Sequence, residues 1–249
     1  MTAFDESAAG TVDPDEVERF SRLARAWWDP EGAFRPLHRI NPVRVGFIRD
    51  RLVRHFERDA RAFAPFAGLR LLDIGCGGGL IAEPMARLGF AVTAIDADAE
   101  ALGVARAHAE EAGLAIDYRA TAVEGLPPDA AFDAVLALEI IEHVPDPAAF
   151  LAAAARPLRP GGALIVATIN RTTLAFALAI VGAEYLLRWV PRGTHRWEKF
   201  VRPSELATGL RGGGLVLREL CGLGYDPRRG WTLGHDLSVN YLAIAIKPK

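Results

Sequence analysis

The sequence predicts an α/β protein with one doubly wound, mostly parallel sheet of seven strands. Three observations lead to this prediction. Apolar runs alternate with segments of helical periodicity between residues 69 and 168, a glycine-rich turn at residues 75–79 follows the first run, and the second run ends in Asp96. Parallel strands need crossover helices between them, so this alternation favours an open sheet with helices on both faces.

The first 68 residues are predicted to form a helical extension ahead of the sheet. An amphipathic helix is expected after the start signal Asp13-Pro14, because apolar residues recur at helical spacing: Val17, Phe20, Ala24 and Trp27. This helix is expected to pack on the main domain, and a role as a lid is the alternative. A second helix is expected to begin near Asn41-Pro42 and to continue with apolar positions to Phe56.

Strands and helices then alternate as far as the fifth strand. Strands are expected at residues 69–74, 91–95, 115–119, 132–138 and 163–168. Helices are expected at residues 80–88, 101–112 and 148–158, the last ended by Pro160-Gly161-Gly162. A helix at 203–210 and an antiparallel pair of strands at 215–220 and 237–246 complete the fold. With no internal repeat or low-complexity linker, a single domain over residues 1–249 is expected, with an insertion at 172–202.

The composition excludes several classes of protein. A chain of 249 residues with 51% hydrophobic residues can bury one large core, and a net charge of −2 gives no general attraction to nucleic acid. The two cysteines, Cys76 and Cys221, lie far apart and indicate neither a disulfide framework nor a zinc site. Residues 1–14 contain acidic residues and no apolar run, so they are not a signal peptide, and a cytoplasmic protein is expected.

The glycine-rich turn indicates a nucleoside site, and its neighbours indicate which nucleoside. A dinucleotide fingerprint needs a small residue where this chain has Leu80, and Asp73 would repel a pyrophosphate. A ligand with a sulfonium and an ammonium group would instead be attracted. The spacing Asp-x-Gly-x-Gly-x-Gly resembles the glycine motif of the seven-strand S-adenosylmethionine-dependent methyltransferases, and this resemblance implies S-adenosylmethionine as the ligand. Gly75 and Gly77 would allow close approach of the backbone, and Asp96 would accept hydrogen bonds from the ribose hydroxyls. A nicotinamide-dependent oxidoreductase is the rival class that these residues argue against.

The loop after the fourth strand carries a second group of polar residues. Glu139, Glu142 and His143 follow Leu138 at the edge of the sheet where the glycine turn also lies. Two carboxylates and an imidazole are suitable ligands for a divalent cation such as Mg²⁺. The alternative is that Glu139 bonds the methionyl ammonium or a backbone amide, Glu142 is a solvated acid, and His143 acts alone as a general base.

Several uncommon strings together resemble the ubiquinone biosynthesis O-methyltransferase family. They are Trp27-Trp28-Asp29, Pro36-Leu37-His38-Arg39-Ile40-Asn41-Pro42, Glu142-His143-Val144-Pro145-Asp146-Pro147, Val181-Gly182-Ala183-Glu184-Tyr185 and Pro191-Arg192-Gly193-Thr194-His195. The resemblance extends from about Val17 to the C-terminus. It implies methylation of phenolic hydroxyls on polyprenylated catechol or quinol precursors of ubiquinone.

The resemblance also implies roles for individual residues. Arg44, Gly75, Asp96 and Leu138 are implied to bind the cofactor, with Arg44 facing its carboxylate and Leu138 forming an apolar wall for the adenine. A divalent cation is implied at Glu139, Glu142 and His143. Two alternatives remain: a methyltransferase for another small phenol or lipid, and a non-catalytic protein with a vestigial site, against which the intact acidic and glycine residues argue.

The insertion at 172–202 is expected to contact a membrane. Residues 174–183 are strongly apolar, but the run is shorter than the roughly 20 residues of a membrane span, and Glu184 separates it from the next apolar residues. Basic residues such as Arg192 and Arg196 flank it, which suits an anionic bilayer surface. Peripheral association with the inner face of the membrane is expected, where other ubiquinone-biosynthesis enzymes are candidate partners. The alternative is that the insertion covers the substrate pocket or a dimer contact.

Overall fold

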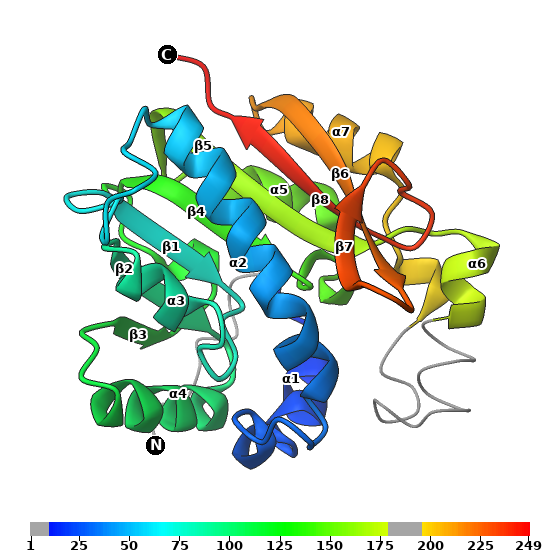
Figure 1. Cartoon of the computed structure of the whole chain (residues 1–249), viewed down its shortest axis with the longest axis horizontal. Coiled ribbons are helices and arrows are strands. Elements are labelled where there is room, and N and C mark those ends of the chain that lie inside the picture. The colour runs from blue at the N-terminus through cyan, green and yellow to red at the C-terminus, as the bar shows by residue number, and fades with distance from the viewer. Residues whose placement is uncertain (1–9, 179–195) are drawn as a thin grey trace.

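The computed structural model describes residues 10–178 and 196–249, which form one eight-stranded sheet in the order β3-β2-β1-β4-β5-β8-β6-β7 (Figure 1). Strands β1 to β5 pair in parallel, and β6, β7 and β8 are antiparallel to their neighbours. The strands are β1 Arg70–Ile74, β2 Ala91–Asp96, β3 Asp117–Ala120, β4 Phe132–Leu138, β5 Leu158–Ile169, β6 Val216–Asp226, β7 Gly230–Gly234 and β8 Asn240–Ile246.

Helices cover both faces of the sheet, which confirms the predicted doubly wound α/β class. In Figure 1, α2 and α3 lie in front of the sheet, and α5 and α7 lie behind it. Side chains of α2, α3 and α4 share one buried cluster with the sheet, and side chains of α5 and α7 share the other. The helices are α1 Pro14–Ser21, α2 Arg35–His55, α3 Ala82–Arg87, α4 Ala99–Glu111, α5 Pro147–Ala155, α6 Thr173–Ala175 and α7 Pro203–Gly212.

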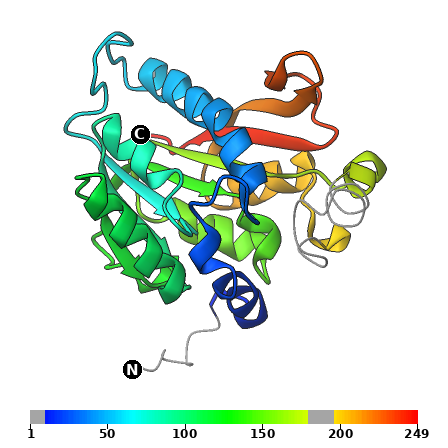
Figure 2. The same cartoon turned by 60° about the horizontal axis from the view of Figure 1, so that its bottom comes forward.

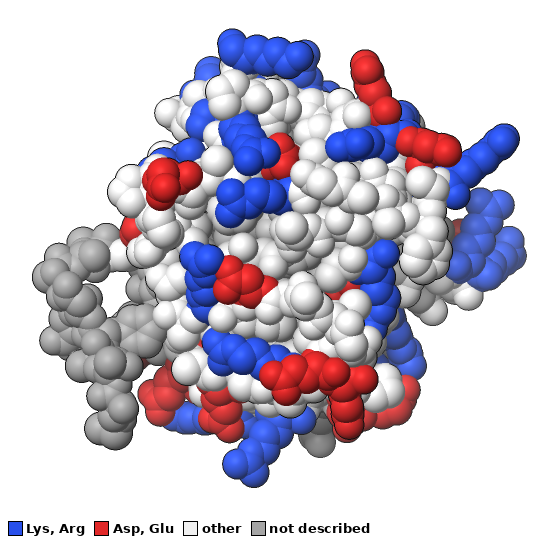
Figure 3. Space-filling view, turned by 90° about the vertical axis from the view of Figure 1, so that its left-hand side faces the viewer, with Lys and Arg blue, Asp and Glu red and all other residues white. Residues whose placement is uncertain are grey.

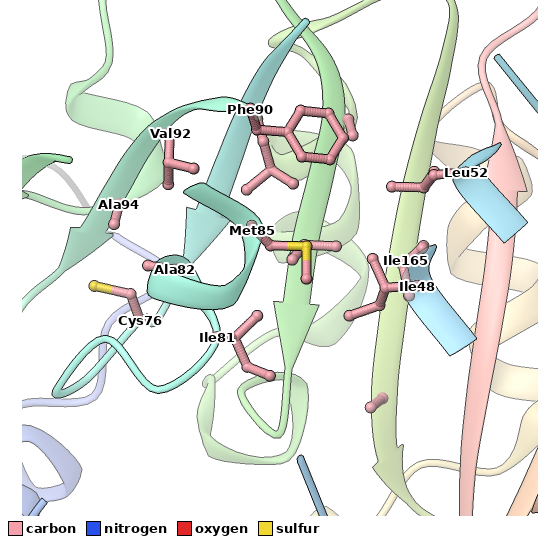
Figure 4. Close-up of a cluster of buried hydrophobic side chains, with 14 of the residues drawn as sticks. Ile48, Leu52, Cys76, Ile81, Ala82, Met85, Phe90, Val92, Ala94 and Ile165 are labelled. Carbon is pink, nitrogen blue, oxygen red and sulfur yellow. The ribbon is translucent and has the colours of Figure 1, made fainter. Parts of the chain in front are cut away.

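The core beneath α2 and α3 fixes the N-terminal extension to the sheet. Figure 4 shows Ile48 and Leu52 of α2, Met85 of α3 and Ile165 of β5 in one cluster, and all four are fully buried. Burying each such side chain contributes about 1.5–3 kcal/mol to folding. Because α2 is held along its length in this way, its N-terminal half is carried to the carboxyl ends of the parallel strands.

Several predicted elements differ from the structure in their boundaries, among them the two helices before the sheet and the fifth strand. The helix predicted to start near Asn41-Pro42 begins at Arg35, because Pro36 occupies the first turn, where a missing N–H has no cost, and Pro42 lies inside the helix. The first helix ends at Ser21, and a short 3₁₀ turn at Ala24–Ala26 follows it.

The fifth strand begins at Leu158 rather than Ala163. The segment Pro160-Gly161-Gly162 therefore lies within a strand whose pairing with β4 shifts register, instead of ending a helix. Strand β7 was not predicted; its five residues begin and end with glycine, a residue that is depleted in strands.

The end of the molecule where the parallel strands finish is covered by α1, as both cartoon views show (Figures 1 and 2). On the face shown in Figure 3, positive and negative side chains are interspersed. Among the described residues, no helix has the length and apolar character needed to cross a bilayer. Most of the predicted insertion at 172–202, including Arg192, lies outside the described residues.

Candidate functional site

The predicted site residues meet where β1, β2 and β4 end side by side. Ile74 of β1 pairs with Ile95 of β2 on one side and with Ala137 of β4 on the other. The glycine turn, Asp96 and the loop after Leu138 therefore leave the sheet at adjacent points. Leu138, the last residue of β4, is partly buried against the core at this edge.

The glycine turn is held by β2. Gly75 and Gly77 have φ angles of 71° and 50°, the left-handed region that favours glycine. The N–H of Gly75 donates to the carbonyl of Ile95 at 2.8 Å, and the N–H of Gly77 donates to Asp96 Oδ2 at 2.7 Å. The turn is thus shaped by the same acidic residue that is predicted to bind the ribose.

The protein's own side chains also require glycine in this turn. A Cβ atom at Gly77 or Gly78 would lie 2.4 or 2.5 Å from the indole side chain of Trp27, and one at Gly75 would lie 2.8 Å from Ile140. The sequence alone gave one reason for these glycines, which is that they let the backbone come close to a ligand. The structure adds a second reason, because the N-terminal extension packs directly against the turn.

Trp28 attaches the extension to the turn and to the adjacent helices. Its indole N–H donates to the carbonyl of Gly78 at 2.9 Å, and its ring stacks on His108 of α4 with centroids 3.4 Å apart. His108 Nδ1 lies 2.6 Å from an oxygen of Glu83, a fully buried carboxylate on α3. The extension therefore packs on the main domain, as predicted for it.

Asp96 retains the capacity to accept further hydrogen bonds. Its Oδ1 accepts from the N–H of Asp98 at 2.9 Å, and its Oδ2 accepts from Gly77. Burial raises the pKa of Asp96 above its ordinary value, while these backbone donors lower it. Each carboxylate oxygen has two lone pairs, so one on each remains for a ligand such as a ribose diol.

Asp73 is a buried carboxyl group behind the turn. Its side chain lies on β1 with 3% exposure, and its Oδ2 has no hydrogen-bond partner within the described chain. Burial, followed by the nearby charge of Asp96, raises the pKa of Asp73 to about 8. A cationic ligand at the turn would stabilise the ionised form of this group.

Arg44 and Glu139 form an ion pair, although the resemblance implied different ligands for them, the cofactor carboxylate for Arg44 and a cation for Glu139. Arg44 lies on α2 with 3% exposure, and one of its guanidinium nitrogens is 2.5 Å from Glu139 Oε1. The same oxygen accepts from Asn240 Nδ2 at 3.2 Å. Glu139 has a φ angle of 54°, a strained conformation for a residue other than glycine, and such conformations gather at functional sites.

Glu142 is buried, so the alternative prediction that it is a solvated acid is wrong. Its side chain is 3% exposed, and its Oε2 accepts a hydrogen bond from the Thr168 hydroxyl at 2.8 Å. Burial, followed by the charge of Glu139, raises its pKa to about 8. The group is therefore mainly protonated at neutral pH.

The three predicted metal ligands are not arranged as a metal site. Within the described residues, no three His, Cys, Asp or Glu side chains lie close enough together to hold a metal ion. Glu139 is paired with Arg44, Glu142 favours its neutral form, and His143 faces another carboxylate. To bind a divalent cation, each of the three would have to leave its present partner or lose its proton.

His143 contacts a residue that the sequence analysis did not single out. Its Nδ1 lies 3.0 Å from an oxygen of Glu16 on α1, and the ring packs edge-on against Phe20 at 5.2 Å between centroids. Glu16 and His143 are separated by 127 positions, and nothing in the local sequence of α1 distinguishes Glu16 from Asp15, the other acid of its first turn.

Comparisons with known proteins agree with this geometry. Residues 72–166 match the family described as "Methyltransferase domain". The chain is 54% identical over 243 residues to a ubiquinone biosynthesis O-methyltransferase of Parvibaculum lavamentivorans, covering 97% of this chain and 96% of the relative. It is 52% identical over 239 residues to the same enzyme of Paramagnetospirillum magneticum, covering 96% of each.

A solved structure shares the fold. The magnesium protoporphyrin IX methyltransferase of Synechocystis PCC 6803, with bound SAH, superposes with a TM-score of 0.62 at 18% sequence identity. The superposition covers 92% of this chain and 94% of that one. At this identity the similarity concerns the fold.

Proposed function

This chain belongs to the ubiquinone biosynthesis O-methyltransferase family, and we propose that it methylates phenolic hydroxyls of polyprenylated catechol or quinol intermediates in ubiquinone biosynthesis. It is an S-adenosylmethionine-dependent O-methyltransferase. The observation that carries this conclusion is an identity of 52–54% to relatives of that name over almost the whole of both chains. A methyltransferase for another small phenol or lipid is the alternative, and substrate assays discriminate the two.

Charge supports the assignment of the cofactor residues. The site presents two carboxyl groups, Asp73 and Asp96, at a turn of backbone glycines, and this arrangement suits a sulfonium cation attached to a ribose. Leu138 offers an apolar side chain at the end of β4 for the adenine. Arg44 is proposed to reach the cofactor carboxylate, and to do so it would share its guanidinium with Glu139.

Methyl transfer needs an oxygen nucleophile placed in line with the sulfonium group. A free phenol has a pKa near 10, so it must be activated by about three pH units at neutral pH. We propose that His143 accepts the phenolic proton at Nε2, because Nδ1 is already directed at Glu16. The N-terminal extension around Trp27 and Trp28 would exclude water from the glycine turn.

The substrate assignment is tested with methyl-transfer assays on two polyprenylated acceptors, a catechol and a demethylated quinol. We expect transfer of the labelled methyl group from S-adenosylmethionine to at least one of them. A short-chain phenol without the prenyl group serves as the comparison. Turnover of the comparison compound alone would show that the enzyme acts on another small phenol.

The buried Asp73 predicts a pH dependence of cofactor binding. Its pKa is raised to about 8 in the free protein, and a bound cation favours the ionised form, so binding below pH 8 should release a proton. We expect the affinity to rise with pH by at most about tenfold per unit and to level off above pH 8. Calorimetry across pH measures this, and Asp73→Asn should remove this part of the slope. An unchanged slope in Asp73→Asn would assign it to another group, such as Asp96, whose pKa burial also raises.

A requirement for Mg²⁺ stays a prediction from the residue types Glu139, Glu142 and His143. It is an alternative to the role of His143 as the base, because one imidazole nitrogen cannot both ligate the cation and accept the proton. A cation would stabilise the developing phenolate of a bound catechol. We expect a chelator to abolish turnover, to leave cofactor binding largely intact, and to be reversed by added Mg²⁺. Glu142→Ala should have the same effect as the chelator. Full turnover in metal-free buffer would leave His143 as a base that acts without a metal.

Peripheral membrane association is proposed because the substrate carries a polyprenyl chain and the start of the insertion is apolar. Leu174, Phe176 and Leu178 are 46%, 44% and 51% exposed. Exposed apolar side chains beside basic residues favour the headgroup region of an anionic bilayer. The other enzymes of the same route remain candidate partners at that surface.

Liposome flotation tests this association. We expect binding to increase with anionic lipid, to weaken with salt, and to fall when Phe176 and Leu178 are replaced by Ser or when Arg192 and Arg196 are replaced by Glu. Phe63→Ser is the matched control, because Phe63 is 93% exposed but precedes β1, away from the insertion. Protein that stays in the soluble fraction at every lipid composition would show that the insertion covers the pocket instead.

A further inference from the structure

We propose that the indole N–H of Trp27 donates a hydrogen bond to an oxygen of the bound S-adenosylmethionine. The proposal deepens the proposed function, because it rests on the assignment of the glycine turn to this cofactor. Trp27 lies in the N-terminal extension, directly after the 3₁₀ turn Ala24–Ala26. The extension thereby binds the cofactor itself, in addition to keeping water away from the turn.

The indole ring of Trp27 lies directly against the glycine turn. A Cβ atom built at Gly77 would lie 2.4 Å from Cζ2, 2.5 Å from Cη2 and 3.0 Å from Cε2 of this ring. Because Nε1 is bonded to Cε2, the indole nitrogen lies one bond away from the atoms that contact Gly77. The N–H of Gly77 in turn donates to Asp96 Oδ2 at 2.7 Å. The indole donor therefore lies beside the part of the turn that is linked to the residue predicted to bind the ribose.

This N–H is buried and has no acceptor among the described residues. Its nitrogen is shielded from solvent and makes no hydrogen bond. A buried donor without an acceptor loses its hydration on folding and gains nothing in return, so such groups are rare in folded proteins. The indole N–H of the neighbouring Trp28, by contrast, donates to the carbonyl of Gly78 at 2.9 Å. An oxygen of the cofactor at the turn supplies the acceptor that Trp27 lacks.

Contacts outside the turn hold the indole ring of Trp27 in place. The ring stacks on Phe34, a buried residue, with 3.7 Å between ring centroids and an interplanar angle of 7°. The carbonyl of Trp27 lies 2.8 Å from Nε2 of His38, near the start of α2. A donor that is held in position before the ligand arrives loses little further conformational freedom on binding, so more of its hydrogen bond appears as affinity.

S-adenosylmethionine offers two kinds of oxygen to this donor. Its ribose hydroxyls are expected at Asp96, and its methionyl carboxylate is expected at Arg44. An indole N–H is a donor only, so it suits either acceptor, and a carboxylate oxygen makes the stronger bond. Two related ligands distinguish them, because S-adenosylhomocysteine carries both groups, whereas methylthioadenosine carries the ribose without the carboxylate.

The test replaces Trp27 with benzothienylalanine, incorporated at this position alone. This analogue keeps the bicyclic ring and exchanges the N–H for a sulfur atom, so the packing against Phe34 and the turn is retained. We expect calorimetry to show that S-adenosylmethionine binds about 5- to 30-fold more weakly than to the wild type, the effect of one lost hydrogen bond. The melting temperature of the free protein should stay the same or rise, because the replacement removes an unpaired buried donor.

The same replacement at Trp28 is the matched control for stability. The N–H of Trp28 already has a protein acceptor, so we expect its loss to lower the melting temperature of the free protein. A contact with the ligand predicts weaker binding without this loss of stability, and a purely structural role for Trp27 predicts the reverse. Unchanged affinity in the Trp27 variant, or a fall in its melting temperature equal to that of the Trp28 variant, would overturn the proposal.

The two related ligands then identify the acceptor. Equal losses of affinity for S-adenosylhomocysteine and methylthioadenosine assign it to the ribose, and a loss confined to S-adenosylhomocysteine assigns it to the carboxylate. If the wild-type protein binds neither S-adenosylmethionine nor S-adenosylhomocysteine, the cofactor assignment fails and the proposed function fails with it. If the wild type binds the cofactor and the Trp27 variant matches it, only the role of Trp27 fails.

Discussion

Replacing Asp96 with Ala is expected to weaken S-adenosylmethionine binding by about 2–3 kcal/mol, or roughly 30- to 150-fold. The change removes the acceptor predicted for the ribose diol, so that buried hydroxyl groups of the cofactor lose a charged partner. It also removes the acceptor for the N–H of Gly77, which lies 2.7 Å from Oδ2. The loss therefore combines a missing contact with a glycine turn that is no longer held in its binding conformation.

Calorimetric titration of the folded variant measures this effect. Asp96→Asn separates the two contributions, because its amide oxygen can still accept one hydrogen bond. Asp117→Ala on the neighbouring strand β3 is the control, since that side chain is exposed and contacts Arg119. Unchanged affinity in a folded Asp96→Ala protein would remove Asp96 from the cofactor site.

The sheet and the glycine turn could be predicted from the sequence because both are local patterns. An apolar run such as Phe132–Leu138 has to be buried on both faces, and its observed bounds equal the predicted ones. The turn from Gly75 needs φ angles that only glycine adopts readily, and Asp96 follows at the end of the next strand. Each of these signals is complete within a few neighbouring residues.

The side-chain pairs of the site could not be predicted, because each joins residues far apart in the chain. Arg44 and Glu139 are separated by 95 positions, and Glu16 and His143 by 127. The sequence indicates that each of these residues is polar but not that they neutralise one another. For this reason the sequence did not predict that Glu139 and His143, two of the predicted metal ligands, have partners within the protein. For the same reason Trp27 was not recognised as a neighbour of Gly77.

The loss of His143 is expected to reduce kcat by about 10²–10⁴-fold, the contribution of a general base, while S-adenosylmethionine binding stays within about twofold of wild type. The reason is that the imidazole faces Glu16 and Phe20 and is not part of the glycine turn or of β2. Steady-state kinetics of His143→Ala give kcat, and calorimetry gives the affinity for the cofactor. His55→Ala is the matched control, because His55 Nε2 bonds the carbonyl of Gly161, at the other end of the sheet.

A kcat close to wild type in His143→Ala would assign the proton transfer to another group. Glu142 is the candidate, because it directly precedes His143 in the sequence. Its side chain is buried, and its pKa is raised to about 8. A carboxyl group with that pKa accepts a proton only when ionised, so activity carried by Glu142 would rise with pH and level off above pH 8. Activity carried by Glu142 would also be lost in Glu142→Gln, a variant that keeps an oxygen acceptor for the Thr168 hydroxyl. The pH profile of His143→Ala and the activity of Glu142→Gln therefore distinguish the two bases.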